Sequence, residues 1–457
     1  MHRQSYSALR SAYRDGSISP VAVTRSALDH AAEVDVRLNA FALIDRERAL
    51  NAARESERRW LAGTPLSPLD GMPMTVKEFA AVQGWPTRRG SLVTAPDAAA
   101  QSAVFVDRLL RAGAVLLGKT RAPEFNWKGV TDSPGYGITR NPLDPALTPG
   151  GSSGGCSAVV AAGVVRVSMG SDAGGSVRIP AAFTGTIGLK PTYGRIPLAP
   201  LPSAFCNVVH VGPIAASVAD LTDVMRVVSG PYAGDWTSVG LRELCFEGAR
   251  SAQGLRIGVL DPDRWRGSDP AVRQGMRETE ALLAQAGFAL RTVDADIQRA
   301  SQAGAFFYTV GCRSAVAAVP ENRRHEIDPG LLRFVEPLRS VAADEMLAMQ
   351  QERDAMAGAL HGLFDEADVL LLPTMPILPF EAGRNTPPGW DSDDWMSWNP
   401  YTPAFNLAHM PALSFPMWPQ GASLPMGVQL VAAKGRDDLV LALAAWLEQR
   451  RPVRLTG

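Results

Sequence analysis

Two glycine-serine clusters lie close together between residues 148 and 180, and they restrict the fold more than any other feature of the chain. The first cluster covers residues 150–155 and the second covers residues 174–176. Between them, small apolar residues at 156–163 predict a short, closely packed helix, and residues 165–169 predict a strand. Glycine tolerates positive φ and lets backbone N–H groups approach a ligand, so such clusters are typical of a backbone that surrounds a reacting group. The stretch therefore predicts a functional site.

Predicted strands and helices alternate through the rest of the chain. Helices are expected at residues 21–32, 49–61, 103–111, 218–228, 271–286, 300–317, 342–366 and 437–449. Strands are expected at residues 71–78, 114–117, 187–189, 208–211, 255–260, 288–293, 369–372, 411–417 and 426–431. This alternation, without an internal repeat, predicts an α/β fold in which a mixed sheet carries helices on both faces.

Charge and cysteine content exclude several classes of protein. The 45 basic and 46 acidic side chains balance, which gives no electrostatic reason to expect nucleic acid or an anionic membrane as a partner. The cysteines show no CxxC spacing, which argues against a structural zinc site or a disulfide framework. No apolar run reaches the ~18 residues that span a bilayer, and the N-terminal segment lacks a secretory hydrophobic stretch. We therefore expect a cytoplasmic protein.

The first cluster contains the string GxSxG, which suggests a nucleophile elbow with Ser153 as the nucleophile. An elbow needs a strand directly before the serine, yet Pro142, Pro145 and Pro149 indicate a loop there. A triad would also need a downstream histidine beside an evident partner motif. The available histidines, none of which has such a motif, are His210, His325, His361 and His409. A histidine-dependent hydrolase is therefore the less favoured alternative.

A serine hydrolase without a histidine needs another base, and an uncharged lysine can serve. Burial removes the solvation of the ammonium group and so lowers the pKa of a lysine, and Ser-Lys variants of the triad exist. Lys77 ends the apolar strand predicted at residues 71–78 and stands beside Glu78. This position makes Lys77 a candidate base, although most lysines are solvated surface charges.

Three segments together resemble the amidase signature family: GMPMTVKE, RNPLDPALTPGGSSGG and GSDAGGSVRIPAAFTGTIGLKPTYGR. Further similarity in RAPEFNWKG, FNLAHMPALSFP and PMGVQLVA extends the resemblance over most of the chain. The resemblance implies a single amidase-signature domain over residues 1–457, with a central, mixed, twisted sheet flanked by helices on both faces. It places the core signature at about residues 71–200, and we expect residues 230–400 to form a subordinate region that covers the active site.

The resemblance also assigns a catalytic triad. It implies that Ser176 is the nucleophile, that Ser152 is a bridging serine held after a cis peptide bond, and that Lys77 is the base. In this mechanism the lysine draws a proton from Ser152, which draws one from Ser176, and the Ser176 oxygen forms an acyl-enzyme with the substrate carbonyl. Water then releases the acid. No metal and no cofactor are expected.

Backbone groups around the nucleophile are expected to form an oxyanion hole. The predicted donors are the N–H groups of Ala173, Gly174, Gly175 and Ser176. By the same resemblance, three polar residues are interpreted as supports of the site: Ser153, Asp172 and Arg178. Cys156 is interpreted as a buried helix residue.

The substrate is predicted to be a small molecule with an aryl or hydrophobic amide, anilide or carbamate group, so urethane cleavage is included. The resemblance implies that Asn126 and Trp127 line the pocket, with Tyr136 nearby. Residues 123–129 differ from the MDEFAMGS-like sequence usual in aminoacyl-tRNA amidotransferase subunits, which disfavours a tRNA-dependent role. The remaining alternative is a glutamine-hydrolysing amidotransferase subunit that acts only in a complex. Otherwise we expect a monomer or a homodimer.

One aromatic loop leaves two interpretations open. Residues 385–401 contain Trp390, Trp395, Trp398 and Tyr401. The loop could form a lid over the active site, since long loops in compact domains are often functional. Alternatively, it could be an exposed loop whose tryptophans pack against one another.

Overall fold

A single mixed sheet of eleven strands runs through the part of the chain that the structure describes. The structure is a computed structural model, and it describes residues 1–200, 204–261, 265 and 267–456. The strand order is β1-β3-β2-β6-β8-β7-β12-β13-β11-β9-β10. The sheet strands are β1 (Phe41–Ile44), β2 (Pro73–Lys77), β3 (Val115–Thr120), β6 (Val167–Asp172), β7 (Ile187–Lys190), β8 (His210–Ala215), β9 (Arg256–Leu260), β10 (Ala289–Val293), β11 (Val369–Pro373), β12 (Ala412–Met417) and β13 (Met426–Val431). A separate two-stranded ribbon pairs β4 (Asp132–Ser133) with β5 (Gly137–Ile138).

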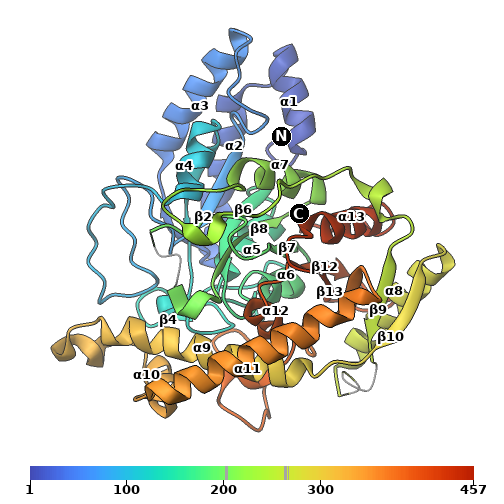
Figure 1. The fold of residues 1–457 in the computed structure, drawn as a ribbon. Coiled ribbons are helices and arrows are strands. Elements are labelled where there is room, and N and C mark those ends of the chain that lie inside the picture. The colour runs from blue at the N-terminus through green and yellow to red at the C-terminus, as the bar shows by residue number, and fades with distance from the viewer. Residues whose placement is uncertain (201–203, 262–264, 266, 457) are drawn as a thin grey trace.

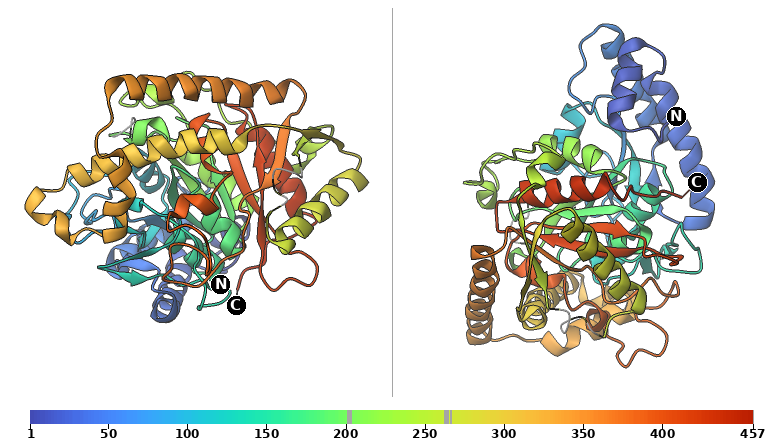
Figure 2. Two further views of the ribbon diagram at one scale, coloured as in Figure 1. Left: turned by 90° about the horizontal axis from the view of Figure 1, so that it is seen from below. Right: turned by 90° about the vertical axis from the view of Figure 1, so that its right-hand side faces the viewer.

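Helices cover both faces of this sheet, as predicted (Figure 1). Their bounds are α1 (Tyr6–Asp15), α2 (Pro20–Leu38), α3 (Arg46–Leu61), α4 (Val104–Arg111), α5 (Gly154–Ala161), α6 (Arg178–Thr184), α7 (Val218–Val228), α8 (Pro270–Gln285), α9 (Ile297–Ala317), α10 (Pro329–Val335), α11 (Ala343–Gly362), α12 (Pro403–Leu407) and α13 (Asp437–Glu448). Helices α4, α7, α8 and α13 pack on one face, and α2, α5 and α6 pack on the other. Helices α9, α10 and α11 lie along one end of the molecule, opposite the end formed by α1 to α4 (Figures 1 and 2).

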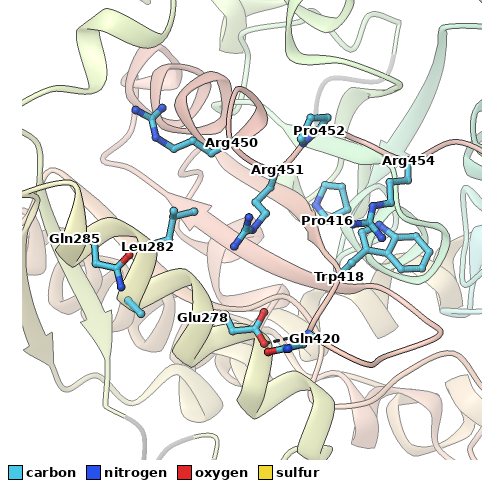
Figure 3. Close-up of a pocket in the computed structure, with 11 residues that line it drawn as sticks. Glu278, Leu282, Gln285, Pro416, Trp418, Gln420, Arg450, Arg451, Pro452 and Arg454 are labelled. Atoms are coloured by element: carbon cyan, nitrogen blue, oxygen red, sulfur yellow. Dashed lines mark hydrogen bonds between the residues drawn. The ribbon is translucent and has the colours of Figure 1, made fainter.

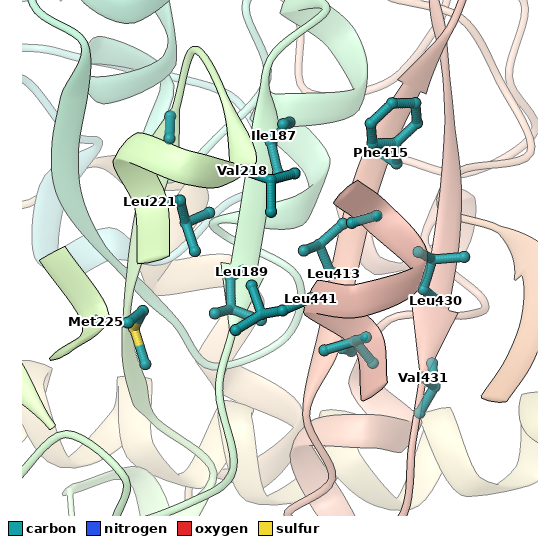
Figure 4. Close-up of a cluster of buried hydrophobic side chains, with 14 of the residues drawn as sticks. Ile187, Leu189, Val218, Leu221, Met225, Leu413, Phe415, Leu430, Val431 and Leu441 are labelled. Carbon is teal, nitrogen blue, oxygen red and sulfur yellow. The ribbon is translucent and has the colours of Figure 1, made fainter. Parts of the chain in front are cut away.

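The largest hydrophobic cluster lies between the sheet and the helices of the α7 and α13 face (Figure 4). Leu189 of β7 and Leu413 of β12 face Leu221 of α7 and Leu441 of α13, and all four side chains are buried. A second cluster on the opposite face joins α2, α5 and β3. Because apolar side chains occupy both faces, strands such as β2 and β6 are buried along their whole length.

Parallel and antiparallel pairs position the chemically important strands. Strand β2 pairs in parallel with both β3 and β6, so β2 and β6 end at the same edge of the sheet. Strand β6 also pairs antiparallel with β8. The carboxyl ends of neighbouring parallel strands form a common crevice, and Lys77 and Asp172 end β2 and β6 there.

Most predicted elements are present, with boundaries shifted by a few residues. The strand predicted at 165–169 runs over Val167–Asp172, and the helix predicted at 156–163 runs over Gly154–Ala161. A helix was expected to open at Ser176, and α6 begins at Arg178. The α-helices and strands that were not predicted are α1, α10, α12, β1, β4 and β5. Apart from α1, which buries Tyr6, Leu9 and Tyr13 at helical spacing, these elements are too short to show a clear periodicity.

Within the described residues, no helix has the length and apolarity needed to cross a bilayer. The same residues contain no group of three or more His, Cys, Asp or Glu side chains that could hold a metal ion. The expected division into a core at about 71–200 and a subordinate region at 230–400 stays a prediction.

Candidate active site

Lys77 stands at the carboxyl end of β2, and its side chain is fully buried. Burial lowers the pKa of Lys77 from its usual 10.5 to about 7, because the ammonium group loses its solvation. The negative charge of Asp172 opposes this shift without cancelling it. A substantial fraction of the amine is therefore uncharged near neutral pH.

The Lys77 amine contacts two serine hydroxyls. Its Nζ lies 2.7 Å from Oγ of Ser152 and 3.2 Å from Oγ of Ser171. Ser152 follows a cis peptide bond, as the sequence analysis predicted. The neighbouring Glu78 is engaged elsewhere, since its carboxylate accepts a hydrogen bond of 3.0 Å from the N–H of Gly90. Both serine partners of Lys77 are neutral groups, which can exchange protons with an uncharged amine.

Ser152, Ser171 and Ser176 line the same cavity, which has a volume of about 220 Å³. Ser176 lies in the turn between β6 and α6 and is buried. The backbone N–H of Ser153 donates a hydrogen bond of 3.1 Å to the carbonyl of Ser176, which joins the two glycine-serine clusters. Ser152 and Ser176 thus line one cavity, and Lys77 lies behind its wall in contact with Ser152, although the three residues come from different segments of the chain.

Asp172 and Arg178 form a fully buried ion pair beneath the Ser176 turn. Nε of Arg178 lies 2.9 Å from Oδ2 of Asp172. The Arg178 guanidinium also donates to side-chain oxygens of Gln429 and Asn406, each at 2.6 Å. Burial alone would raise the pKa of Asp172, but the Arg178 charge outweighs burial and holds this pKa well below its usual range. The contacts agree with the predicted supporting role of both residues.

The predicted oxyanion hole needs one correction. The N–H of Gly175 donates a hydrogen bond of 2.7 Å to Oδ1 of Asp172, so it is already engaged inside the protein. It cannot also face a substrate oxygen in this conformation. The backbone donors that remain candidates are those of Ala173, Gly174 and Ser176.

Of the three predicted substrate-binding residues, only Asn126 lines the cavity. Trp127 is turned into the protein, where its ring packs against Phe334 and its Nε1 donates to Oδ2 of Asp328 at 3.2 Å. The Tyr136 ring instead lies near the Arg121 guanidinium, 5.3 Å from the ring centre. The prediction that Trp127 lines the pocket is therefore wrong, because alignment to a family segment does not determine which way a side chain points. Tyr136 was expected only near the pocket, and this stays a prediction.

Most of the apolar wall of the cavity was not predicted from the sequence. The wall is built by aromatic side chains from distant segments: Phe79, Phe105, Phe125, Phe205 and Tyr308. Tyr308 comes from α9, and its hydroxyl donates a hydrogen bond of 2.6 Å to the carbonyl of Asn126. Phe79 directly follows the Lys77–Glu78 pair, so its closeness to Lys77 in the sequence was the one feature that could have predicted its place in the cavity wall.

The histidine-dependent alternative is not supported by the geometry. Ser153 is buried, and its Oγ donates to the carbonyl of Ser171 at 3.1 Å. Nε2 of His409 lies 2.7 Å from the carbonyl oxygen of Asn207, and the His409 ring stacks on Tyr193. Burial lowers the pKa of His409 to about 3. Neither Ser153 nor any histidine is among the described residues that line the cavity.

A family model named Amidase matches residues 22–441 of this chain. The chain belongs to the amidase family. It is 32% identical to an acylamidase of Rhodococcus erythropolis over 99% of this chain and 96% of the relative. It is 34% identical to a glutamyl-tRNA(Gln) amidotransferase subunit of Deinococcus deserti, over 98% of this chain and 96% of the relative. Its fold matches the crystal structure of a bacterial aryl acylamidase with a TM-score of 0.89 at 27% identity, over 99% of this chain and 97% of the other.

These comparisons confirm the resemblance and the fold, and they support a hydrolase that acts on amide bonds. They do not separate acylamidases from amidotransferase subunits, because a relative of each kind is similar to this amidase over nearly the whole chain. The sequence evidence against an amidotransferase subunit therefore comes from one segment, residues 123–129. The residues that line the cavity therefore decide which of these two activities we propose for this chain.

A second hollow of this amidase, shown in Figure 3, shares no lining residue with the catalytic cavity. It lies between α8 and the C-terminal segment, with Arg451, Arg454 and Trp418 around it. Its Glu278 accepts a hydrogen bond from the N–H of Gln420 at 3.0 Å. It contains no serine among its described lining residues.

Proposed function

We propose that this amidase hydrolyses small, neutral amides with an aryl or other hydrophobic group, including anilides and carbamates. The observation that carries the proposal is the buried Lys77, with a pKa of about 7, in contact with Ser152 at the wall of an apolar cavity that also contains Ser176. An uncharged amine in contact with one serine hydroxyl, at a cavity that a second serine also lines, is the arrangement that a histidine-free serine hydrolase needs.

The first half of the reaction forms an acyl-enzyme. Uncharged Lys77 takes the proton of Ser152, Ser152 takes the proton of Ser176, and the Ser176 oxygen attacks the substrate carbonyl carbon. The resulting tetrahedral oxyanion collapses and the carbon-nitrogen bond breaks. The proton held by Lys77 passes back through Ser152 to the leaving nitrogen, so the amine departs neutral. Lys77 is then uncharged again.

The second half repeats the relay with water. A water molecule gives a proton through Ser152 to Lys77 and attacks the ester carbonyl of the acyl-enzyme. Collapse of this second intermediate returns the proton to the Ser176 oxygen and releases the carboxylic acid. With a carbamate substrate the released acid is a carbonic acid derivative, and the same steps apply.

The oxyanion would be stabilised by the backbone N–H groups of Ala173, Gly174 and Ser176, with Gly175 excluded by its bond to Asp172. The cavity lies beside these groups, since Ala173 and Ser176 are among its lining residues. In a water-poor cavity, such fixed donors stabilise developing charge better than water does.

The wall of the cavity supports a neutral, hydrophobic substrate. Apolar side chains dominate it, several of them aromatic, and Arg89 is the one charged side chain among its described lining residues. Asn126 supplies a polar contact: its Oδ1 is buried and has no hydrogen-bond partner among the described residues. This oxygen can accept a hydrogen bond from a substrate N–H group, which favours amides, anilides and carbamates that carry one.

The same wall disfavours the amidotransferase alternative. Free glutamine carries an ammonium and a carboxylate, and each would need a partner on entering an apolar cavity. No described lining residue is acidic, and Arg89 is exposed. The alternative remains a candidate because the relatives of similar identity include amidotransferase subunits.

The decisive experiment is a substrate screen on the purified chain. Nitroanilides, aryl carbamates, aliphatic amides and glutamine are compared, with Ser176→Ala as the blank. We expect turnover of the aryl substrates, a loss of at least about a thousandfold in Ser176→Ala, and no release of ammonia from glutamine. Glutamine turnover that requires a co-purified partner would instead establish the amidotransferase alternative. An inactive His409→Gln variant that still folds would restore the histidine alternative.

A further inference from the structure

We propose that Asn399 and Thr402 are positioning residues that hold the oxyanion loop, residues 173–176, from the side opposite the substrate. The inference rests on the proposed function, because it concerns the backbone donors of that same site. It also assigns a role to the aromatic loop at residues 385–401, for which the sequence left two interpretations.

Two side-chain groups that can donate a hydrogen bond lie close to the carbonyl oxygen of Gly174. Nδ2 of Asn399 lies 2.6 Å from this oxygen, and Oγ1 of Thr402 lies 2.7 Å from it. Oγ1 of Thr402 also lies 2.6 Å from Oδ1 of Asn399, and because a hydroxyl carries a single proton, Thr402 donates to only one of these two oxygens at a time. Both side chains are buried, with 2% and 0% exposure. Water therefore cannot replace them at low energetic cost.

These contacts clamp one peptide unit at both ends. The Gly174 carbonyl and the Gly175 N–H belong to the same planar peptide, and they point to opposite sides of it. The carbonyl end is held by Asn399 and Thr402, and the N–H end is held by Asp172. The orientation of this peptide, together with the dihedral angles of Gly174 and Gly175, sets the directions of the flanking N–H groups of Gly174 and Ser176. Those two groups are oxyanion donors in the proposed mechanism.

Consecutive glycines make such an external clamp necessary. Gly175 has a φ of +118°, in a region that other residues rarely adopt, and a glycine pair has more backbone freedom than any other pair. A Cβ added at Gly175 would lie 2.2 Å from Oγ1 of Thr402. The threonine is thus packed directly against the backbone that it orients, and the loop gains its fixed geometry from tertiary contacts.

The aromatic loop provides a rigid base for this clamp. Trp395 and Trp398 are fully buried, and their rings contact Tyr308 and Phe380 respectively. The segment around Trp390 is exposed instead. No residue of 385–401 is among the described residues that line the catalytic cavity. The aromatic loop therefore supports the oxyanion loop from the side opposite the substrate. Because none of its residues is among the described residues that line the cavity, the lid interpretation is not supported.

The test compares Thr402→Val, Thr402→Ser and Asn399→Ala with the unmodified chain. Thr402→Val keeps the shape of the side chain and removes the hydroxyl, so we expect kcat to fall about tenfold or more while KM changes by less than about twofold. Thr402→Ser keeps the hydroxyl and should restore most of the rate. Ser397→Ala is the matched control, because Ser397 lies on the same loop and its hydroxyl bonds Trp390 and Asp394 rather than the oxyanion loop. Thermal unfolding of each variant checks that it folds.

A second readout separates this inference from the proposed function. The rate at which a fluorophosphonate probe modifies Ser176, followed by intact mass, depends on the oxyanion donors but not on the amide chosen. Slower labelling of Thr402→Val and Asn399→Ala, with Ser397→Ala unchanged, would support the clamp even if every amide tested is inert. Equal labelling rates, or a kcat loss that Thr402→Ser does not rescue, would overturn it. A chain that neither labels nor turns over an amide would refute both proposals.

Discussion

At the scale of single residues, the protonation state of Lys77 controls the proposed chemistry. Only the uncharged amine can accept a proton, and the pKa of Lys77 is about 7. We therefore predict that kcat/KM rises about tenfold per pH unit below pH 7 and levels off above it. A pH–rate profile with a neutral anilide checks this, and a profile flat from about pH 5 to pH 9 would show that Lys77 is not the base.

The same residue should link stability to pH. Between about pH 7 and pH 10, folded Lys77 is mostly uncharged while unfolded Lys77 is protonated, so the unfolded state binds more protons. The contribution of Lys77 to the free energy of unfolding should then rise with pH across this window. Urea unfolding at about pH 7.5 and pH 9.5 measures the rise. In Lys77→Met this part of the pH dependence should disappear, and an unchanged slope would contradict the buried, neutral lysine.

Removing one partner of a buried ion pair leaves an uncompensated charge, and Asp172 provides the test. In Asp172→Asn the Arg178 guanidinium keeps its contacts with Gln429 and Asn406 but loses its counter-ion. We predict a loss of about 3 to 5 kcal/mol in the free energy of unfolding, measured by urea titration. The exposed Arg256–Asp368 pair is the control, because Asp368→Asn should cost less than about 1 kcal/mol.

At the scale of elements, α5 shows why small residues are required beside the site. A Cβ added at Gly155 would lie 2.6 Å from the carbonyl of Arg121 and 2.7 Å from that of Ala40, and both are backbone atoms. Gly155→Ala should therefore destabilise the protein by about 1 to 3 kcal/mol or more through overpacking. Gly358 in α11 meets nothing within 4 Å, so Gly358→Ala should stabilise by up to about 1 kcal/mol. Equal unfolding temperatures for the two variants would contradict the packing of α5.

At the scale of the whole molecule, one sheet contains strands of both the expected core, at about residues 71–200, and the expected subordinate region, residues 230–400. Strands β9, β10 and β11 of the later region extend the sheet that contains β2 and β6. The main hydrophobic cluster likewise includes side chains from Tyr6 to Leu447. We predict one calorimetric unfolding transition and no stable fragment from limited proteolysis near residue 200 or 230. Two separated transitions would show that the regions are independent domains.

Local sequence was sufficient for most of the helices and strands and for the motif residues. Most strands and helices followed from periodicity, since each element buries a face that its own residues define. Lys77, Ser152 and Ser176 followed from motif resemblance; in the structure Lys77 contacts Ser152, and Ser152 and Ser176 line one cavity. The motifs carry this information because the backbone conformation that they need depends on glycines and serines at fixed spacing.

Side-chain direction and long-range contact were decided only by the tertiary structure. The side chain of Trp127 is turned into the protein, where it contacts Asp328, whereas its neighbour Asn126 lines the cavity. No local sequence pattern distinguishes these two positions. The N–H of Gly175, which was predicted to be an oxyanion donor, is hydrogen-bonded to Asp172 instead. The aromatic wall and the Asn399–Thr402 clamp join residues far apart in the chain. Such contacts depend on how whole elements pack, and packing is a property of the assembled core that no short segment contains.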